Sequence, residues 1–181
     1  MSTFKRIRNT GTIVIAAAVL AACVVQPPSV KPPALGTAVS AEDIARWDIS
    51  IPPSGAGLPK GGGTARQGLQ VYEQKCMACH GAKGVGKPAD VLVGGVGSLA
   101  SKTPLRTVGS YWPYATTLFD YVRRSMPTAN PLSLSNEEVY AVSAYVLFLN
   151  GIVGEDVQMN AQTLPLVKMP NRDGFVDMSR R

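Results

Sequence analysis

The pentapeptide Cys76-Met77-Ala78-Cys79-His80 constrains this chain more than any other feature. His80 is the only histidine among 181 residues, and the chain holds just one further cysteine, Cys23. Cysteines at this spacing occur in redox dithiols, disulfides, zinc sites and haem attachment sites. The chemistry of the site therefore depends on which of these so small a ligand set can support.

Three of the four chemistries fit poorly. A redox dithiol needs a strand–helix–strand context, whereas this motif follows a predicted helix. Structural zinc takes four ligands, and only Cys76, Cys79 and His80 remain once Cys23 is assigned elsewhere. A disulfide between Cys76 and Cys79 would close a tiny loop and stabilise little. Cys-x-x-Cys-His is the pattern of covalent haem attachment, so we predict one haem c on Cys76 and Cys79, with His80 as proximal iron ligand.

The N-terminal sequence predicts export and a lipid anchor. Lys5, Arg6 and Arg8 precede a short uncharged apolar run, residues 12–22, as in a secretory signal peptide. The run ends in LAAC, which resembles a bacterial lipobox and makes Cys23 the predicted lipidation site. Ordinary cleavage before an unmodified Cys23 is the alternative. Removal of the three basic residues lowers the formal net charge from +6 to about +3, and no basic run with interleaved aromatics supports nucleic-acid binding.

The chain divides into five predicted segments. Residues 1–22 form the lipoprotein signal peptide, and residues 23–42 a lipidated, proline-rich tether. Residues 43–63 form either an extended arm on the domain surface or a plain linker. Residues 64–154 form a monohaem domain, and residues 155–181 a C-terminal extension that packs on it. The apolar side chains that would hold the arm on the domain are Trp47, Ile49 and Ile51.

Three helical patterns lie within the domain, over residues 64–76, 112–125 and 135–151. Ser135 and Glu138 form a capping box at the start of the third. No strand pattern stands out, so the predicted fold class is all-α, with three or more helices and long loops around one covalent haem. The predicted inward side chains are Leu69, Tyr72, Cys76, Leu118, Phe119, Val122, Val139, Val142, Val146 and Leu149.

The distal iron ligand is predicted to be a methionine, because the chain has no second histidine and Cys23 is assigned to the lipid. Met126 opens a proline-containing loop after the second helix and is the predicted ligand. Met169, which also precedes a proline, is the alternative. Methionine–histidine ligation raises the reduction potential of haem iron.

Residues flanking this loop carry less specific signals. Arg123 and Arg124 are predicted to lie on a solvated helix face, with partner docking or pairing with haem propionates as alternatives. Residues 111–114, rich in aromatics, either wall the haem pocket or pack in the core.

The order of helix, Cys-x-x-Cys-His, glycine-rich loop, helix, Met-Pro loop and helix resembles a class I cytochrome c. Residues 57–81, 107–127, 137–153 and 169–175 resemble cytochrome subunits of molybdenum sulfite dehydrogenases and the haem domain of the Sox sulfane dehydrogenase. The resemblance implies the class I cytochrome c fold and places Met126 at the usual distal ligand position.

The resemblance also implies an electron-transfer protein rather than an enzyme. We expect a monohaem cytochrome that is lipid-anchored on the periplasmic side of a Gram-negative cell membrane. Its electron donor would be a molybdenum dehydrogenase acting on sulfite or another sulfur compound, and its acceptor a downstream cytochrome or oxidase. The alternatives are a generic carrier to terminal oxidases, and a haem enzyme or gas-binding protein with open iron.

Overall fold

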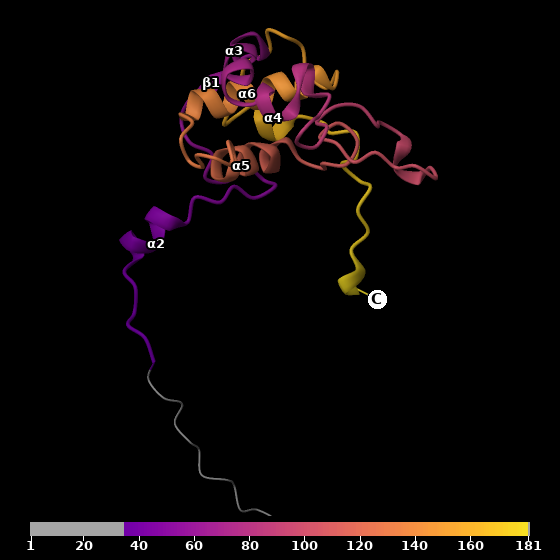
Figure 1. The fold of residues 1–181 in the computed structure, drawn as a ribbon. Helices are drawn as coiled ribbons and strands as arrows, with labels where there is room; N and C mark the ends of the chain where they lie inside the picture. The colour runs from indigo at the N-terminus through magenta and orange to yellow at the C-terminus, as the bar shows by residue number, and fades with distance from the viewer. Residues whose placement is uncertain (1–34, 181) are drawn as a thin grey trace, which may run out of the picture. The chain divides into compact units, whose positions relative to one another are not determined.

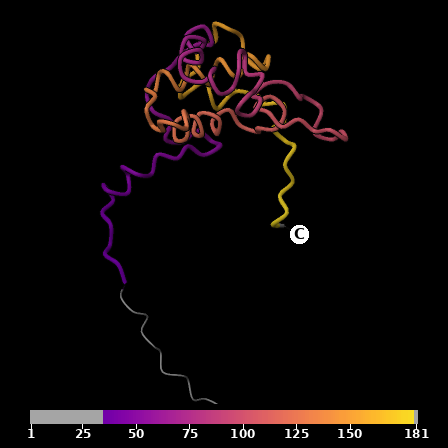
Figure 2. Tube along the Cα trace, viewed as in Figure 1, coloured from indigo at the N-terminus to yellow at the C-terminus, as the bar shows by residue number. Residues whose placement is uncertain are grey.

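The computed structural model describes residues 35–180 (Figures 1 and 2). The predicted signal peptide, Cys23 and most of the predicted tether lie outside the described residues. The chain separates into two compact units, Met1–Ser40 and Ala41–Arg181, and the described helices and strands all belong to the second. Within residues 35–180, no helix combines the length and apolar character needed to cross a bilayer.

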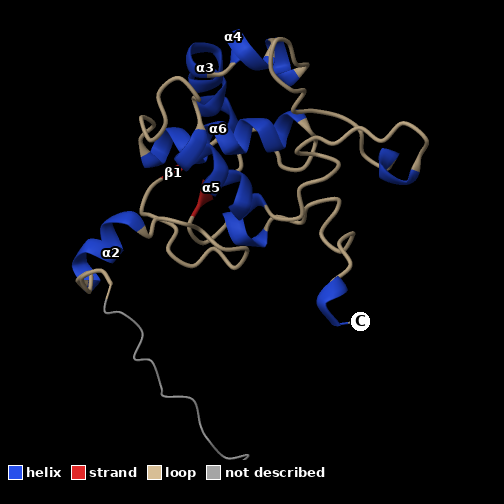
Figure 3. Cartoon of the chain, turned by 60° about the horizontal axis from the view of Figure 1, so that its bottom comes forward, coloured by secondary structure: helices blue, strands red, loops and turns tan. Residues whose placement is uncertain are grey.

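Helices make up almost all of the regular secondary structure in residues 35–180, which confirms the all-α prediction (Figure 3). One two-stranded antiparallel ladder joins β1 to β2, with Gly62 opposite Asn160 and Gly63 opposite Met159. The elements are α2 (Ala41–Trp47), β1 (Gly62–Gly63), α3 (Ala65–Lys75), α4 (Met77–His80), α5 (Ala115–Ser125), α6 (Asn136–Leu149), β2 (Met159–Asn160) and the short 3-10 turns η1 (Ala82–Gly84), η2 (Ser98–Ala100), η3 (Leu164–Leu166) and η4 (Met178–Arg180).

Local sequence sets where α3 and α6 begin. Thr64 caps α3 by accepting a hydrogen bond from the Gln67 N–H, and the Gln67 side chain accepts one from the Thr64 N–H in return. Ser135 and Glu138 form the predicted capping box at α6. These reciprocal bonds satisfy backbone donors that a helix start otherwise leaves unpaired.

The core forms where α3 and α6 cross. Gly68 of α3 lies against the backbone of Ala141 of α6, so closely that a Cβ at position 68 would overlap the Ala141 carbonyl. Tyr72 lies one turn further along α3 and is 1% exposed. The largest side chains buried around this crossing are Tyr72, Phe119, Tyr140, Leu147, Met159 and Leu164.

Two details differ from the sequence prediction. Leu69 was predicted to face inward but is 37% exposed, because Gly68 takes the place against α6 and each residue turns about 100° from the last. The second helix begins at Ala115 rather than at residue 112, because Tyr114 is extended (φ −140°) as its N-cap. The short helix α2 and the two-residue strands were not predicted.

Residues 49–53 lie against helix α5, whereas the Trp47 side chain does not pack on the domain as predicted. Ile51 is 4% exposed and joins the core, while Trp47 is 86% exposed. The Ile51 N–H donates to Asp120 Oδ1 at 2.8 Å, and Thr116 Oγ1 donates to the Pro53 carbonyl at 3.0 Å. The name arm is kept for residues 48–53, the part of the predicted arm 43–63 that holds these contacts.

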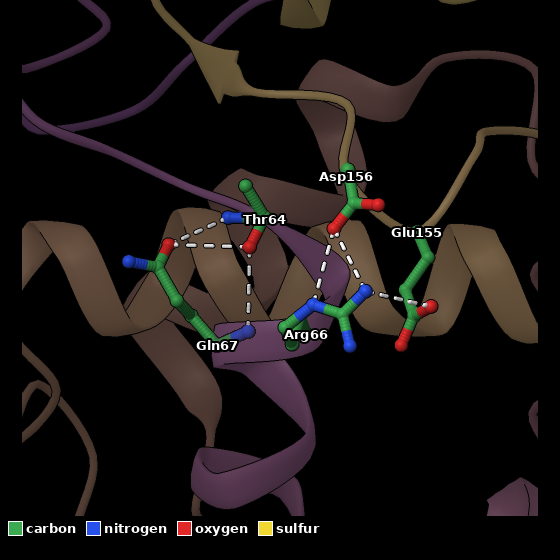
Figure 4. A network of polar contacts seen from close by, with 5 residues as sticks. All are labelled: Thr64, Arg66, Gln67, Glu155 and Asp156. Carbon is green, nitrogen blue, oxygen red and sulfur yellow. Dashed lines mark hydrogen bonds and ion pairs between the residues drawn. The ribbon is translucent and has the colours of Figure 1, made fainter.

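The residues after α6 return to the start of α3 (Figure 4). Arg66 pairs with Glu155 at 3.2 Å and with Asp156 at 3.0 Å, and the Ala65 N–H donates to the Glu155 carbonyl. The side chains that this returning segment adds to the core are Met159, Leu164 and Met169.

Candidate functional site

Cys76 to His80 form one helical turn at the end of α3. Cys76 caps α3 through its N–H, which donates to the Tyr72 carbonyl. The Cys76 carbonyl then accepts from the N–H groups of Cys79 and His80 at 3.1 and 2.9 Å. Residues three and four positions apart share a helix face, so both thiols and the imidazole project to one side of this turn.

Both thiols of the motif are free. Cys79 is exposed and Cys76 is half-buried against the core. Burial, and secondarily the charge of Cys79, raises the pKa of the Cys76 thiol to about 11, so it is protonated at neutral pH. Within residues 35–180, no three His, Cys, Asp or Glu side chains gather as a metal-binding cluster.

The backbone of the next loop fixes the orientation of His80. His80 Nδ1 lies 2.9 Å from the carbonyl oxygen of Asp90. A carbonyl can only accept, so Nδ1 carries the proton and Nε2 keeps its lone pair for a metal ion. Hydrogen bonding at the remote ring nitrogen is how proteins commonly orient a metal-binding histidine. This contact could not be predicted from the sequence, because every residue has a backbone carbonyl that could accept the Nδ1–H hydrogen bond.

The loop after His80 closes back over the motif. Gly81 has φ +72°, and a Cβ there would overlap the carbonyl of Gly86, so position 81 requires glycine. The Gly86 N–H donates to the His80 carbonyl at 2.7 Å, and Tyr72 Oη donates to the Gly81 carbonyl at 2.8 Å. The haem motif is thereby tied directly to a core side chain of α3.

Asn150 holds the following stretch in place. Its Nδ2 donates to the Leu92 carbonyl at 3.1 Å, and its Oδ1 accepts from the Gly94 N–H at 3.1 Å. Thr107 Oγ1 donates to the Gly94 carbonyl at 2.6 Å. The sequence predicted only a helix-ending role for Asn150, because Leu92 and Gly94 lie more than 50 positions away from it.

Met126 lies where α5 ends. Its N–H donates to the Val122 carbonyl at 3.1 Å, and its extended backbone (φ −118°) turns the chain out of the helix. Its side chain is only half-buried by protein atoms. A thioether in this setting could turn toward a bound group.

Met169, the alternative ligand, lies in a different setting. Its side chain is 3% exposed and belongs to the hydrophobic core. The protein's own atoms already surround the Met169 thioether, which is the usual role of a core methionine. Burial thus distinguishes the two methionines, and Met126 stays the predicted distal ligand.

The two arginines of α5 do not form a plain solvated face. Arg124 makes a two-pronged ion pair with Asp120, with nitrogen–oxygen distances of 2.9 and 2.5 Å. Arg123 Nη1 donates to the Ile49 carbonyl at 3.3 Å. Both side chains therefore support the attachment of the arm to α5.

Residues 111–114 contact both helix α5 and the C-terminal segment. The Trp112 ring meets Tyr121 edge to face, with centroids 5.6 Å apart. The Arg172 guanidinium lies 4.1 Å from the centre of the Tyr114 ring, and Asn171 Nδ2 donates to the Tyr111 carbonyl at 2.8 Å. The C-terminal segment thus braces the chain that leads into α5.

Comparison with known proteins identifies this architecture. Residues 63–146 match the family model described as cytochrome C oxidase, cbb3-type, subunit III. A chain of the crystal structure of the sulfane dehydrogenase SoxCD from Paracoccus pantotrophus is 38% identical, with a TM-score of 0.75. The similarity covers 82% of this chain and 73% of that one. The chain belongs to the cytochrome c family. No curated protein matches this cytochrome.

Members of the cytochrome c family bind haem c covalently and transfer electrons. The site fits that cofactor on two observations. Two free thiols and an imidazole share one helical turn, and the His80 Nε2 lone pair is available. The fold prediction, a class I cytochrome c, is confirmed by these matches.

Proposed function

We propose that this cytochrome is the monohaem electron-transfer subunit of a dehydrogenase. The observation that carries the proposal is the Cys76–His80 turn, with His80 Nδ1 bonded to the Asp90 carbonyl. In the proposal, Cys76 and Cys79 would hold haem through thioether bonds, and His80 and Met126 would bind its iron. Haem iron supplies one-electron chemistry when bound, and the residues of this chain orient it and limit its contact with water.

Each protein group has a defined part in that arrangement. His80 keeps one ring orientation because its Nδ1–H bond to Asp90 opposes rotation. A fixed orientation of the His80 ring lowers the structural change that accompanies each electron transfer. Ligation by Met126 in addition to His80 would raise the reduction potential, which suits an acceptor of electrons from a dehydrogenase.

The likeness to the sulfane dehydrogenase SoxCD supports a sulfur-compound dehydrogenase as donor. We propose a molybdenum enzyme that oxidises sulfite or sulfane sulfur and delivers its two electrons one at a time. A second cytochrome or an oxidase receives them. In the same proposal the chain is exported and lipidated at Cys23, so it works on the periplasmic side of a cell membrane.

Substrate-dependent haem reduction tests the proposal. The haem-loaded full chain is added to a periplasmic extract of the producing organism, and the visible haem bands are followed after addition of sulfite or thiosulfate. Reduction by a sulfur compound, but not by formate or succinate, supports the proposed donor. Equal reduction by all donors indicates a generic carrier. A reduced protein that binds carbon monoxide at once indicates open iron and contradicts the proposal.

A further inference from the structure

Within residues 35–180, helix α2 buries none of its side chains against another element. It is seven residues long and none of its side chains is buried. Ile44 and Trp47 are 53% and 86% exposed, and their spacing of three places them on one helix face. Isolated helices shorter than about 12 residues are marginal in water and depend on packing of an apolar face. The apolar face of α2 therefore requires a surface beyond those supplied by residues 41–180.

Hydrogen bonds join the C-terminal end of α2 to the domain. The Asp48 N–H donates to the Ile44 carbonyl at 2.8 Å and continues the helix by one bond. Ile49 and Ile51 are then bonded to Arg123 and Asp120 of α5. Trp47 precedes Ile51 by four positions, so its Cα lies within about 14 Å of that of Ile51. Trp47 is thus exposed on a short, anchored segment.

The similarity to SoxCD includes this segment. The match covers 82% of 181 residues, which is about 148, so it begins at or before residue 34 even if it continues to the C-terminus. The matched span therefore includes α2 and the arm, although both lie outside residues 63–146 of the family model. A segment that is retained outside the haem domain, and that presents an exposed tryptophan, is expected to serve the enzyme complex.

We propose that α2 is the docking element for the catalytic subunit of the dehydrogenase, with Trp47 as its anchor and Ile44 beside it. The inference rests on the proposed function and names the surface through which the partner binds. Tryptophan is the residue most typical of binding hot spots, where its ring fills a desolvated pocket. The partner offers an apolar pocket for the indole ring, with a basic group at its rim facing Glu42.

A bilayer is the poorer occupant of this face. Glu42 and Asp43 lie in the first turn of α2, and Asp48 follows its last residue. Arg46 pairs with Asp43, so three carboxylates and one guanidinium give the segment a net charge of −2. Helices that lie on membranes carry mainly Lys and Arg on their polar face, because the lipid surface is anionic. The acidic character of this segment favours a protein pocket with a basic rim.

Photo-crosslinking from position 47 tests the proposal in cells of the producing organism. The full chain carries p-benzoylphenylalanine in place of Trp47, and the crosslinked product is identified by mass spectrometry. We expect a product with the catalytic subunit of a molybdenum dehydrogenase. The same probe in place of Leu166, which is 75% exposed on η3, is the control and should not give this product. Products with lipid, with a second copy of this chain, or none at all would overturn the proposal.

A kinetic measurement separates this inference from the proposed function. In the extract assay, Trp47→Ala should raise the cytochrome concentration needed for half-maximal reduction by about tenfold or more. Leu166→Ala should leave that concentration unchanged, and both variants should melt within a degree or two of the wild type. If sulfur compounds reduce Trp47→Ala as readily as wild type, the docking role is wrong and the electron-transfer role stands. If sulfur compounds do not reduce the wild type either, both the docking role and the proposed electron-transfer function are wrong.

Discussion

Asp120 Oδ1 accepts a 2.8 Å hydrogen bond from the backbone N–H of Ile51, which lies 69 positions earlier in the chain. The same carboxylate pairs with Arg124, one turn along α5. Burial alone would raise the pKa of Asp120, but the hydrogen bonds from Arg124 and Ile51 and the charges of Arg124 and Arg123 hold it below its ordinary value. This carboxylate therefore links the arm to α5.

Replacement of this carboxylate should weaken the fold most near neutral pH. Asp120→Asn should lower the free energy of unfolding at pH 7 by about 2 kcal/mol, since a hydrogen bond to a charged group contributes roughly 1.5–3 kcal/mol. The folded pKa lies below the unfolded value of about 3.9, so the stabilisation is present above that value and is lost as pH falls through the folded pKa. In urea titrations at pH 7, 4 and 3, the free energies of unfolding of wild type and Asp120→Asn should become more similar as the pH falls. Asp173→Asn, at an exposed position, is the control, and parallel curves for wild type and Asp120→Asn would contradict the assignment.

Met126 and Met169 should respond differently to truncation. Met126→Ala should remove the methionine-to-iron charge-transfer band and lower the reduction potential, because the thioether ligand is lost. Met169→Ala should leave the band in place and lower the free energy of unfolding by about 2–5 kcal/mol, as for a buried methionine. Visible spectroscopy and chemical denaturation of both variants show which methionine binds iron. Loss of the band in Met169→Ala alone would reverse the assignment.

Covalent attachment should depend on both cysteines of the motif. The double variant Cys76→Ala with Cys79→Ala should lose all haem stain on a denaturing gel, because no thiol remains in the motif to form a thioether bond. Each single variant should retain some stain. Met77→Ala, at a 39% exposed position between the cysteines, should stain like the wild type. Haem that stays bound to the double variant after denaturation would exclude this attachment site.

Gly68→Ala should destabilise the fold, although alanine is the better helix former. Helix propensity alone would favour alanine by about 1 kcal/mol. A Cβ at this position overlaps the Ala141 carbonyl, so α3 and α6 would have to separate, at a cost of about 3 kcal/mol. Thermal melts of Gly68→Ala and of Gln70→Ala, on the exposed side of α3, provide the comparison. A more stable Gly68→Ala variant would show that the two backbones do not touch.

Features that depend on neighbouring residues could be predicted from the sequence. The start of α6 was predictable because Ser135 and Glu138 satisfy each other's backbone donors within one turn. The haem motif is equally local, since Cys76 to His80 form a single helical turn. Even the Asp120–Arg124 pair follows a spacing of four on one helix, although the sequence treated Arg124 as solvated.

Features that depend on residues distant in the chain could not be predicted from the sequence. The inward face of α3 was misplaced at Leu69, because only the approach of Ala141 shows that Gly68 must face α6. The distinction between Met126 and Met169 rests on burial, which both Met-Pro sequences leave open. The contact of Arg123 with the Ile49 carbonyl spans 74 positions, and no local pattern announces it.

The pairing of β1 with β2 affects the order of events during synthesis. Gly63 meets Met159, so this part of the domain cannot close until the ribosome has made 159 of the 181 residues. Cys76 to His80 emerge long before that, while the chain is still open. Bringing such distant segments together carries a loop-closure entropy that local helices avoid. A chain truncated before Met159 lacks one strand of this ladder, so it should be cleaved by proteases more readily than the full chain.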